Sequence, residues 1–253
     1  MSTFNHSNDP VQIHAARRSF RDGPTERVIL DGVDLSIAPG EMVAVMGPSG
    51  SGKTTLLQMV AGLDRPDSGQ VIVNGTHLSA CDLGQLAQMR REVIGYVEQR
   101  LNLIGVLTAI ENVMLPLELG GIKPRKARPT AMAALDSVGL ADHADLASER
   151  LSGGEQQRVA IARALVGTRS VVLADEPTAA LDSLTGESVM KLLRRRCDDA
   201  GASVLVATHD AGHAAWADRV VFLRDGVILD QASPPPSPAV VESVDPREQE
   251  ARR

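Results

Sequence analysis

The most constraining stretch of the sequence is a glycine- and serine-rich loop that follows five apolar residues, 42–46. The loop fits the pattern G-x-x-x-x-G-K-[ST] through Gly47, Gly52, Lys53 and Thr54. Its N–H groups open onto a helix N-terminus and form an anion cradle, in which glycines leave room for phosphates and allow unusual φ values. There Lys53 reaches the β- and γ-phosphates, and the Thr54 hydroxyl ligates Mg²⁺. The alternative, a glycine-rich turn that happens to carry a lysine, is weaker because an expected strand and helix flank the loop.

Length and composition indicate a folded protein with an aliphatic core. The 253 residues suit one large domain or two small ones, and 43% are hydrophobic while only 2% are aromatic. The apolar runs are far shorter than the ~20 residues of a membrane-spanning helix. Residues 1–10 are too polar for a signal peptide. We therefore expect the chain to stay in the cytosol without crossing a membrane.

Charge and cysteine content narrow the possible functions. The net charge of −6 argues against a nucleic-acid partner, because nucleic-acid-binding proteins usually carry a basic surface. Cys81 and Cys197 are isolated and form no CxxC motif, so neither a disulfide framework nor a zinc site is expected.

Continuous apolar runs indicate strands that are buried on both faces, as in a parallel sheet covered by helices. They span residues 42–46, 171–174, 203–207 and 220–223. Two half-exposed or shorter strands are expected at 11–16 and 28–37, on either side of a turn signal at Gly23-Pro24.

The domain organisation follows from the same patterns. We expect one domain over 11–230, with a helical part at about 101–168. Residues 1–10 and the proline-rich stretch 231–253 are expected to be disordered, because they hold too little apolar surface to pack.

Two carboxylates follow the run 171–174, at the end of the expected strand, where ligands bind in open α/β sheets. Asp175 is costly in such a place unless it is paired or near a metal, so we expect it to hold Mg²⁺ through water. Glu176 is placed to polarise the attacking water as a general base. The alternative is a pair of carboxylates in a surface turn before Pro177.

Two further polar side chains follow expected strands. His209 comes after the run 203–207, where it can hydrogen-bond a γ-phosphate or the attacking water. Gln99 comes after a short expected strand at 93–97, where it can orient water or contact Mg²⁺, although an exposed glutamine is the usual case.

A second anion site is expected where Ser152, Gly153 and Gly154 precede a helical segment. Ser152 is a good N-cap, and the free N–H groups beside it attract anions. One interpretation is an ordinary cap with a glycine turn. The other is that this second site faces the nucleotide of another copy of the chain.

Taken together, the motifs resemble those of the nucleotide-binding subunits of ATP-binding-cassette (ABC) transporters, over roughly residues 11–230. The diagnostic stretch, 151–158, is similar to the family's signature motif. The family's other motifs are matched in order: Walker A at 47–55, the Q-loop at Gln99, Walker B at 171–176, the D-loop at 180–182 and the H-loop at His209. Phe20 stands where the family usually has an aromatic residue that stacks on adenine, most often a tyrosine.

The resemblance implies a fold, cofactors and site residues. The fold is the α/β P-loop NTPase, with a mainly parallel core sheet flanked by helices, an antiparallel β subdomain and a helical signature subdomain. The cofactors are ATP and Mg²⁺, with Thr54, Gln99 and Asp175 at the metal and Glu176, His209 and Gln99 as catalytic residues. The expected nucleotide contacts are Phe20, Gly47, Pro48, Ser49, Gly50, Ser51, Gly52, Lys53, Thr54, Thr55, Ser152, Gly153, Gly154 and Asp182.

The resemblance also implies partners. Two copies sandwich two ATP molecules head to tail, and a separate permease chain holds them at the inner face of the cell membrane. Residues 103–119 look most like the lipoprotein-releasing and macrolide-export branch. Glu98, the pair Gly105-Val106 and Ser148 depart from the usual pattern and put the identity of the permease in doubt.

Two rival functions belong to other classes. A soluble ABC-type ATPase of translation or DNA repair usually has two cassettes or a long coiled coil, and the roughly 100 residues between Thr54 and Leu151 leave no room for one. The ATPase of a non-transporting membrane complex, such as a cell-division regulator, is compatible with the sequence.

Overall fold

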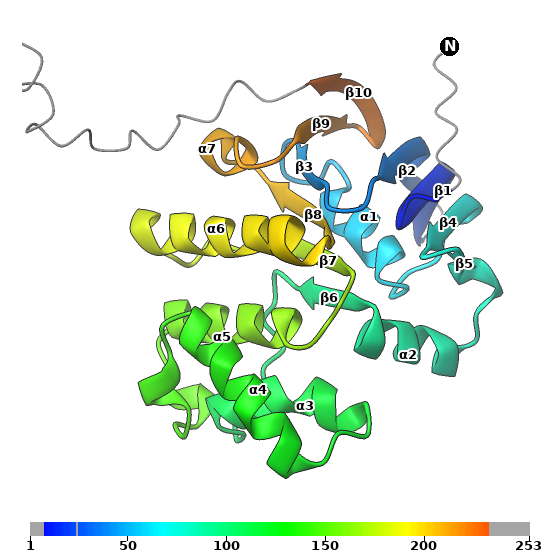
Figure 1. Cartoon of the computed structure of the whole chain (residues 1–253). Coiled ribbons are helices and arrows are strands. Elements are labelled where there is room, and N and C mark those ends of the chain that lie inside the picture. Colours follow the sequence, from blue (N-terminus) through cyan, green and yellow to red (C-terminus); the bar gives the residue numbers. More distant parts are fainter. Residues whose placement is uncertain (1–7, 24, 233–253) are drawn as a thin grey trace, which may run out of the picture.

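The computed structural model describes residues 8–23 and 25–232, which form two β-sheets and their covering helices (Figure 1). The strands are β1 (Val11–Asp22), β2 (Thr25–Ile37), β3 (Met42–Met46), β4 (Ser68–Val73), β5 (Thr76–His77), β6 (Ile94–Val97), β7 (Val171–Asp175), β8 (Ser203–Thr208), β9 (Arg219–Arg224) and β10 (Val227–Ala232). The α-helices are α1 (Lys53–Val60), α2 (Leu83–Glu92), α3 (Ala109–Leu119), α4 (Pro124–Ser137), α5 (Gly153–Leu165), α6 (Ser183–Ala200) and α7 (Ala211–Ala214).

The expected disordered ends lie mostly outside the described residues, namely at 1–7 and 233–253. At the C-terminal side, β10 continues to Ala232, so Gln231 belongs to a strand rather than to the expected tail.

The core sheet has the order β10-β9-β3-β8-β7-β6. All neighbouring pairs from β9 to β6 run parallel, and β10 alone is antiparallel to its neighbour, β9. The predicted mainly parallel sheet is thereby confirmed. Strand β3, which leads into the glycine-rich loop, lies between β8 and β9.

Each central strand contributes to two hydrophobic cores, one on each face of the sheet. In β3, Met42 and Ala44 pack with residues of α3–α6, whereas Val43 and Val45 pack with α1 and the antiparallel sheet. Side chains alternate across a strand, so a strand covered on both sides must be apolar at every position. This explains the continuous apolar runs in the sequence.

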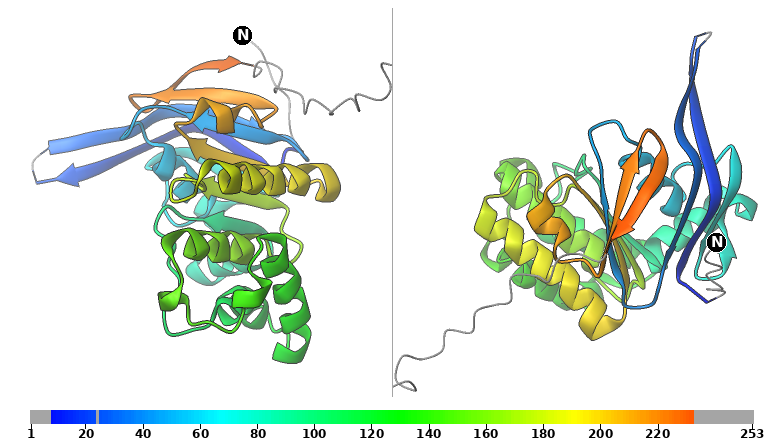
Figure 2. Two further views of the ribbon diagram at one scale, coloured as in Figure 1. Left: turned by 90° about the vertical axis from the view of Figure 1, so that its left-hand side faces the viewer. Right: turned by 90° about the horizontal axis from the view of Figure 1, so that it is seen from above.

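The second sheet is antiparallel, with the order β2-β1-β4-β5. Strands β1 and β2 are longer than predicted, because they form a hairpin that continues past 16 and begins before 28. Figure 2 shows this hairpin extending beyond the core sheet. The predicted turn lies at its tip, where Gly23 has a φ of 59°; Pro24 lies outside the described residues.

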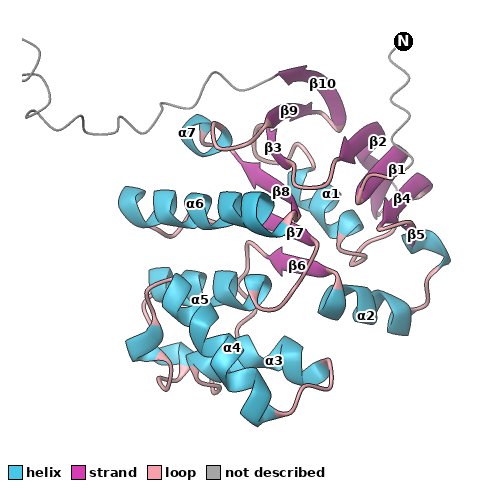
Figure 3. Cartoon of the chain, viewed as in Figure 1, coloured by secondary structure: helices cyan, strands magenta, loops and turns pink. Residues whose placement is uncertain are grey.

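Helices α3, α4 and α5 form a separate layer, on the side of β6 away from the antiparallel sheet (Figure 3). Among the described residues, no helix has both the length and the apolar character that crossing a membrane requires.

A fully buried amide, Asn112, holds this helical layer to the loop before α3. It accepts the N–H of Ile104 at 2.9 Å and donates to the backbone oxygens of Ile104, Leu107 and Thr108. It also donates to the hydroxyl of Ser148 at 2.8 Å, so this departure from the family pattern has a structural role.

We expect Asn112→Ala to lower the free energy of unfolding by about 2–3 kcal/mol, because it leaves buried polar groups without partners. Urea unfolding followed by circular dichroism measures the change. Glu118→Gln, at an exposed position of the same helix, is the control and should change stability by less than about 0.5 kcal/mol. Equal stability of Asn112→Ala and the control would contradict the assigned role.

Candidate functional site

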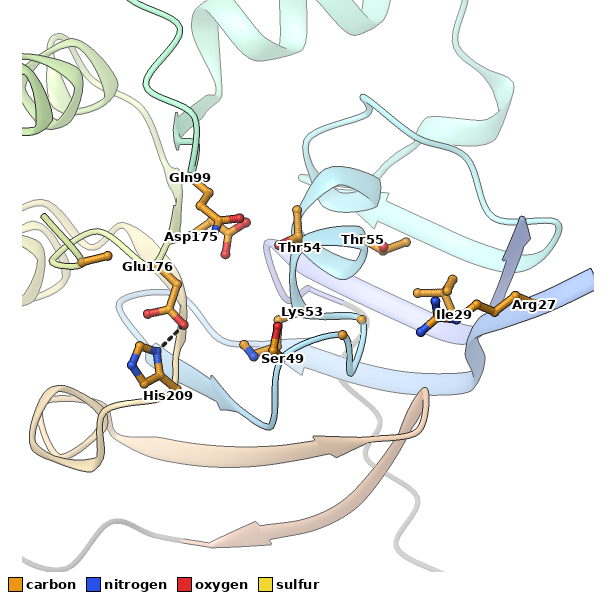
Figure 4. Close-up of a pocket in the computed structure, with 13 residues that line it drawn as sticks. Arg27, Ile29, Ser49, Lys53, Thr54, Thr55, Gln99, Asp175, Glu176 and His209 are labelled. Carbon is orange, nitrogen blue, oxygen red and sulfur yellow. Dashed lines mark hydrogen bonds and ion pairs between the residues drawn. The ribbon is translucent and has the colours of Figure 1, made fainter. Parts of the chain in front are cut away.

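A cavity of about 650 Å³ lies at the carboxyl ends of the core strands (Figure 4). Ten of the residues expected from the sequence line it: Ser49, Gly50, Gly52, Lys53, Thr54, Thr55, Gln99, Asp175, Glu176 and His209. They come from the glycine-rich loop, the first turn of α1, the last residue of β7 and the segments that follow β6, β7 and β8. The parallel order of the strands brings their ends together, as the rule for open α/β sheets requires.

Two positions of the loop, Gly47 and Gly52, leave no room for a side chain, because neighbouring strands approach them closely. A Cβ on Gly47 would overlap the carbonyl oxygen of Leu223, at the end of the neighbouring strand β9. Gly52 has a φ of 106°, and a Cβ there would lie 2.9 Å from the oxygen of Ile29. Gly52 is the N-cap of α1 but supplies no side-chain cap, which leaves N–H groups of the first helical turn free for an anion.

Lys53 places its charge inside the loop. Its Nζ donates to the carbonyl oxygens of Gly47 at 2.7 Å and Pro48 at 3.1 Å. Among the described residues it forms no ion pair with a carboxylate, so the ammonium group is available to an anionic ligand.

Asp175 ends β7 and is only 2% exposed. Its Oδ2 is buried without a hydrogen-bond partner. Burial raises the pKa of this carboxyl and the charge of Glu176 adds to that, while a hydrogen bond from Thr54 and the charge of Lys53 oppose the rise. An unpartnered carboxylate oxygen beside a threonine hydroxyl fits a hard cation such as Mg²⁺.

Any such metal must also use oxygens other than carboxylates. The described residues hold no group of three or more His, Cys, Asp or Glu side chains suited to a metal. Gln99 lines the same cavity and offers an amide oxygen, and a bound triphosphate would supply further oxygens.

Glu176 and His209 form the polar wall opposite the loop. Glu176 has a φ of 48°, a left-handed conformation that non-glycine residues rarely adopt and that concentrates at functional sites. Its Oε1 lies 2.8 Å from Nδ1 of His209. A carboxylate only accepts, so Nδ1 carries the proton. The hydrogen bond and the charge of Glu176 raise the pKa of His209.

The structure does not bring every expected residue to this cavity. Gly47, Pro48 and Ser51 belong to the loop but do not line the cavity, and Ser51 is buried. Asp182, the N-cap of α6, lines a neighbouring cavity of about 1100 Å³ that shares Glu176 and His209 with the first.

The serine-glycine segment lies elsewhere. Ser152 caps α5, which packs on the opposite face of the core sheet from α1. Its hydroxyl is held in a capping box with Glu155, at 2.7 Å. Gly154 packs against the turn at Ala180, whereas a Cβ on Gly153 would meet no atom within 4 Å. The glycine-rich loop and the Ser152 segment thus begin helices that cover opposite faces of the core sheet.

Phe20 is also not a lining residue. It is 44% exposed on β1, and the guanidinium of Arg18 lies 4.5 Å from the centre of its ring. Directly opposite it on β2 is Arg27, which does line the cavity.

Sequence reasoning missed three lining residues, Arg27, Ile29 and Ala179. A signal for Arg27 was present: a turn at 23–24 pairs Phe20 with Arg27 in an antiparallel hairpin. No comparable signal pointed to Ala179.

Comparison with known proteins gives a consistent result. The model of the ABC transporter family matches residues 30–179. An uncharacterised ABC transporter ATP-binding protein of Mycobacterium tuberculosis (strain CDC 1551 / Oshkosh) is 44% identical, over 87% of this chain and 88% of its own. The macrolide export ATP-binding/permease protein MacB of Shewanella sp. (strain ANA-3) is 42% identical over 90% of this chain, which spans only 34% of that protein.

A solved structure has the same fold. The ATP-binding cassette MJ0796, in a dimeric post-hydrolysis state bound to ADP and Pi, superposes with a TM-score of 0.86 at 39% identity, covering 89% of this chain and 99% of that one. A second dimeric structure of MJ0796, there described as a bacterial ABC transporter cassette, gives the same values. The chain therefore belongs to the ABC transporter family and is one of its ATP-binding, ATP-hydrolysing cassettes.

Proposed function

We propose that two copies of this chain close on ATP, open after hydrolysis, and thereby drive a separate membrane permease of the exporter type. The observation that carries the proposal is that the helices beginning after Gly52 and Ser152, the two expected anion sites, cover opposite faces of the core sheet. A single copy cannot use both sites on one nucleotide. The dimeric MJ0796 cassettes support a dimer, and we infer that in it each copy completes the other's site.

The residues of the cavity divide the work of hydrolysis. The loop residues 47–55, Lys53 among them, bind the triphosphate. Thr54, Asp175 and Gln99 would hold Mg²⁺. The metal would neutralise charge on the phosphate oxygens. Glu176 accepts a proton from the attacking water as a general base, and His209 orients its carboxylate and contacts the γ-phosphate.

The second copy would complete the site. Ser152, Gly153, Gly154 and Asp182 face the nucleotide held by the partner copy, and Phe20 stacks on adenine at the hairpin side. Support comes from the exposure of Ser152 and Gly153 and from the open space beside Gly153, where a ligand from outside the chain can approach. Closure would exclude water from the phosphates, and hydrolysis would remove the contacts that hold the copies together.

A permease as partner is supported by the relatives. The macrolide export proteins are named ATP-binding/permease proteins, and this chain matches about a third of their length. A permease would hold the cassettes at the inner face of the cell membrane.

Glu176→Gln is expected to retain ATP binding but to lose at least about 100-fold in ATP turnover, because an amide cannot accept the proton from water. It should also accumulate an ATP-bound dimer. Phosphate release and light scattering measure the two effects, with the exposed position Asp199→Asn as the control. Turnover within twofold of the wild type would rule out Glu176 as the base.

Ser152→Arg and Gly153→Arg are expected to abolish the ATP-dependent dimer in the Glu176→Gln background while ATP binding persists, because a long cation would fill the partner's phosphate site. Gly153→Arg keeps the serine cap, so it separates interface loss from helix destabilisation. Ser79→Arg, exposed in the short helix Leu78–Ala80, is the control. Dimers of normal abundance in both variants would contradict the assignment.

A further inference from the structure

The side chain of Arg27 points from β2 toward the glycine-rich loop (Figure 4). Its Nη2 lies 3.9 Å from the place that a Cβ on Gly50 would occupy, in the middle of the loop. Arg27 and Ile29, two positions apart on one strand, both line the cavity, as the alternation of side chains requires.

The position of Arg27 is fixed by the hairpin. The register pairs Ser19 with Val28, Phe20 with Arg27 and Arg21 with Glu26, without a shift between them. Residues directly opposite each other in an antiparallel pair project to the same face. Arg27 therefore lies on the face of the hairpin that carries Phe20.

The charge of Arg27 is not neutralised within the described part of the chain. Two other arginines of the hairpin have carboxylate partners: Arg17 lies 3.3 Å from Asp31, and Arg18 lies 2.7 Å from Asp64. Arg27 has no hydrogen bond or ion pair among the described residues, although it borders the cavity in which we expect the phosphates to bind. An unpaired guanidinium beside a phosphate-binding loop is suited to phosphate oxygens, which it contacts through two parallel N–H groups.

We propose that Arg27 is a second cationic ligand of the nucleotide's phosphate chain, acting with Lys53. This inference deepens the proposed function and rests on it. Lys53 binds from inside the loop and Arg27 from the hairpin side, so a triphosphate lies between two cations. The hairpin thereby becomes part of the nucleotide site through its charge as well as through the ring of Phe20.

The test compares equilibrium binding of ATP, ADP and AMP to the full chain without permease. Arg27→Gln is expected to raise the Kd for ATP about fivefold, because an exposed charge pair contributes modestly to binding. The loss of affinity should fall with the charge of the phosphate chain, so the Kd for ADP should rise by less and the Kd for AMP by less than about twofold. It should also make the Kd for ATP less sensitive to salt. Arg27→Lys should restore part of the affinity. Arg21→Gln, on the facing strand and away from the cavity, is the matched control and should leave each Kd within twofold.

Two outcomes would overturn the proposal for Arg27 alone. One is an ATP affinity of Arg27→Gln equal to that of Arg21→Gln. The other is an equal loss for ATP and AMP, which would assign Arg27 to the base or ribose instead. Failure of the wild type itself to bind ATP would overturn the nucleotide site and, with it, the proposed function.

Discussion

The structure depends on the packing of one glycine-rich loop against the backbones of two strands, β9 and β2. Gly47 lies so close to the carbonyl oxygen of Leu223 that no side chain fits, and Gly52 turns with a φ of 106° against the backbone of Ile29. Lys53 closes the loop from within by donating to Gly47 and Pro48. These contacts hold the loop in its shape without a ligand, and a preorganised cradle would lose less entropy on binding phosphate. The polar residues at the carboxyl ends of the neighbouring strands then lie around this loop.

The rest of the site holds features that are unfavourable in an isolated protomer. Asp175 has a buried oxygen without a partner, and Glu176 adopts a left-handed backbone conformation. Such features persist where a surrounding fold enforces them and a ligand uses them. The segment at Ser152 has its own capping box and lies on the far face of the sheet, so it contributes nothing to the cavity of its own chain. In the proposed dimer, the nucleotide of the partner copy would be the ligand of this segment.

Much of this arrangement could be predicted from the sequence because it is local. The apolar runs predicted the core strands, and the polar residues after them predicted ten of the cavity's lining residues, from Ser49 to His209. The contribution of β2 was not predicted. It depends on the length and register of a hairpin whose exposed part has no strong apolar alternation. The turn at 23–24 was a signal that could have paired Phe20 with Arg27, but the observed pairing with β1 was needed to show that β2 extends far enough to place Arg27 and Ile29. The separation of Ser152 from the loop depends on which face of the sheet each helix covers, and that is a property of the whole fold.

The central claim is that the loop of one copy meets the Ser152 segment of another around ATP. Disulfide formation between copies tests it most directly, using a mixture of Ser49→Cys and Ser152→Cys chains that each still bind ATP. The native thiols, Cys81 and Cys197, are buried, and the wild type reports their background. The account predicts a cross-link between the two different variants that forms with ATP and not without nucleotide. Cross-links confined to identical variants, or a yield that ATP does not change, would contradict it.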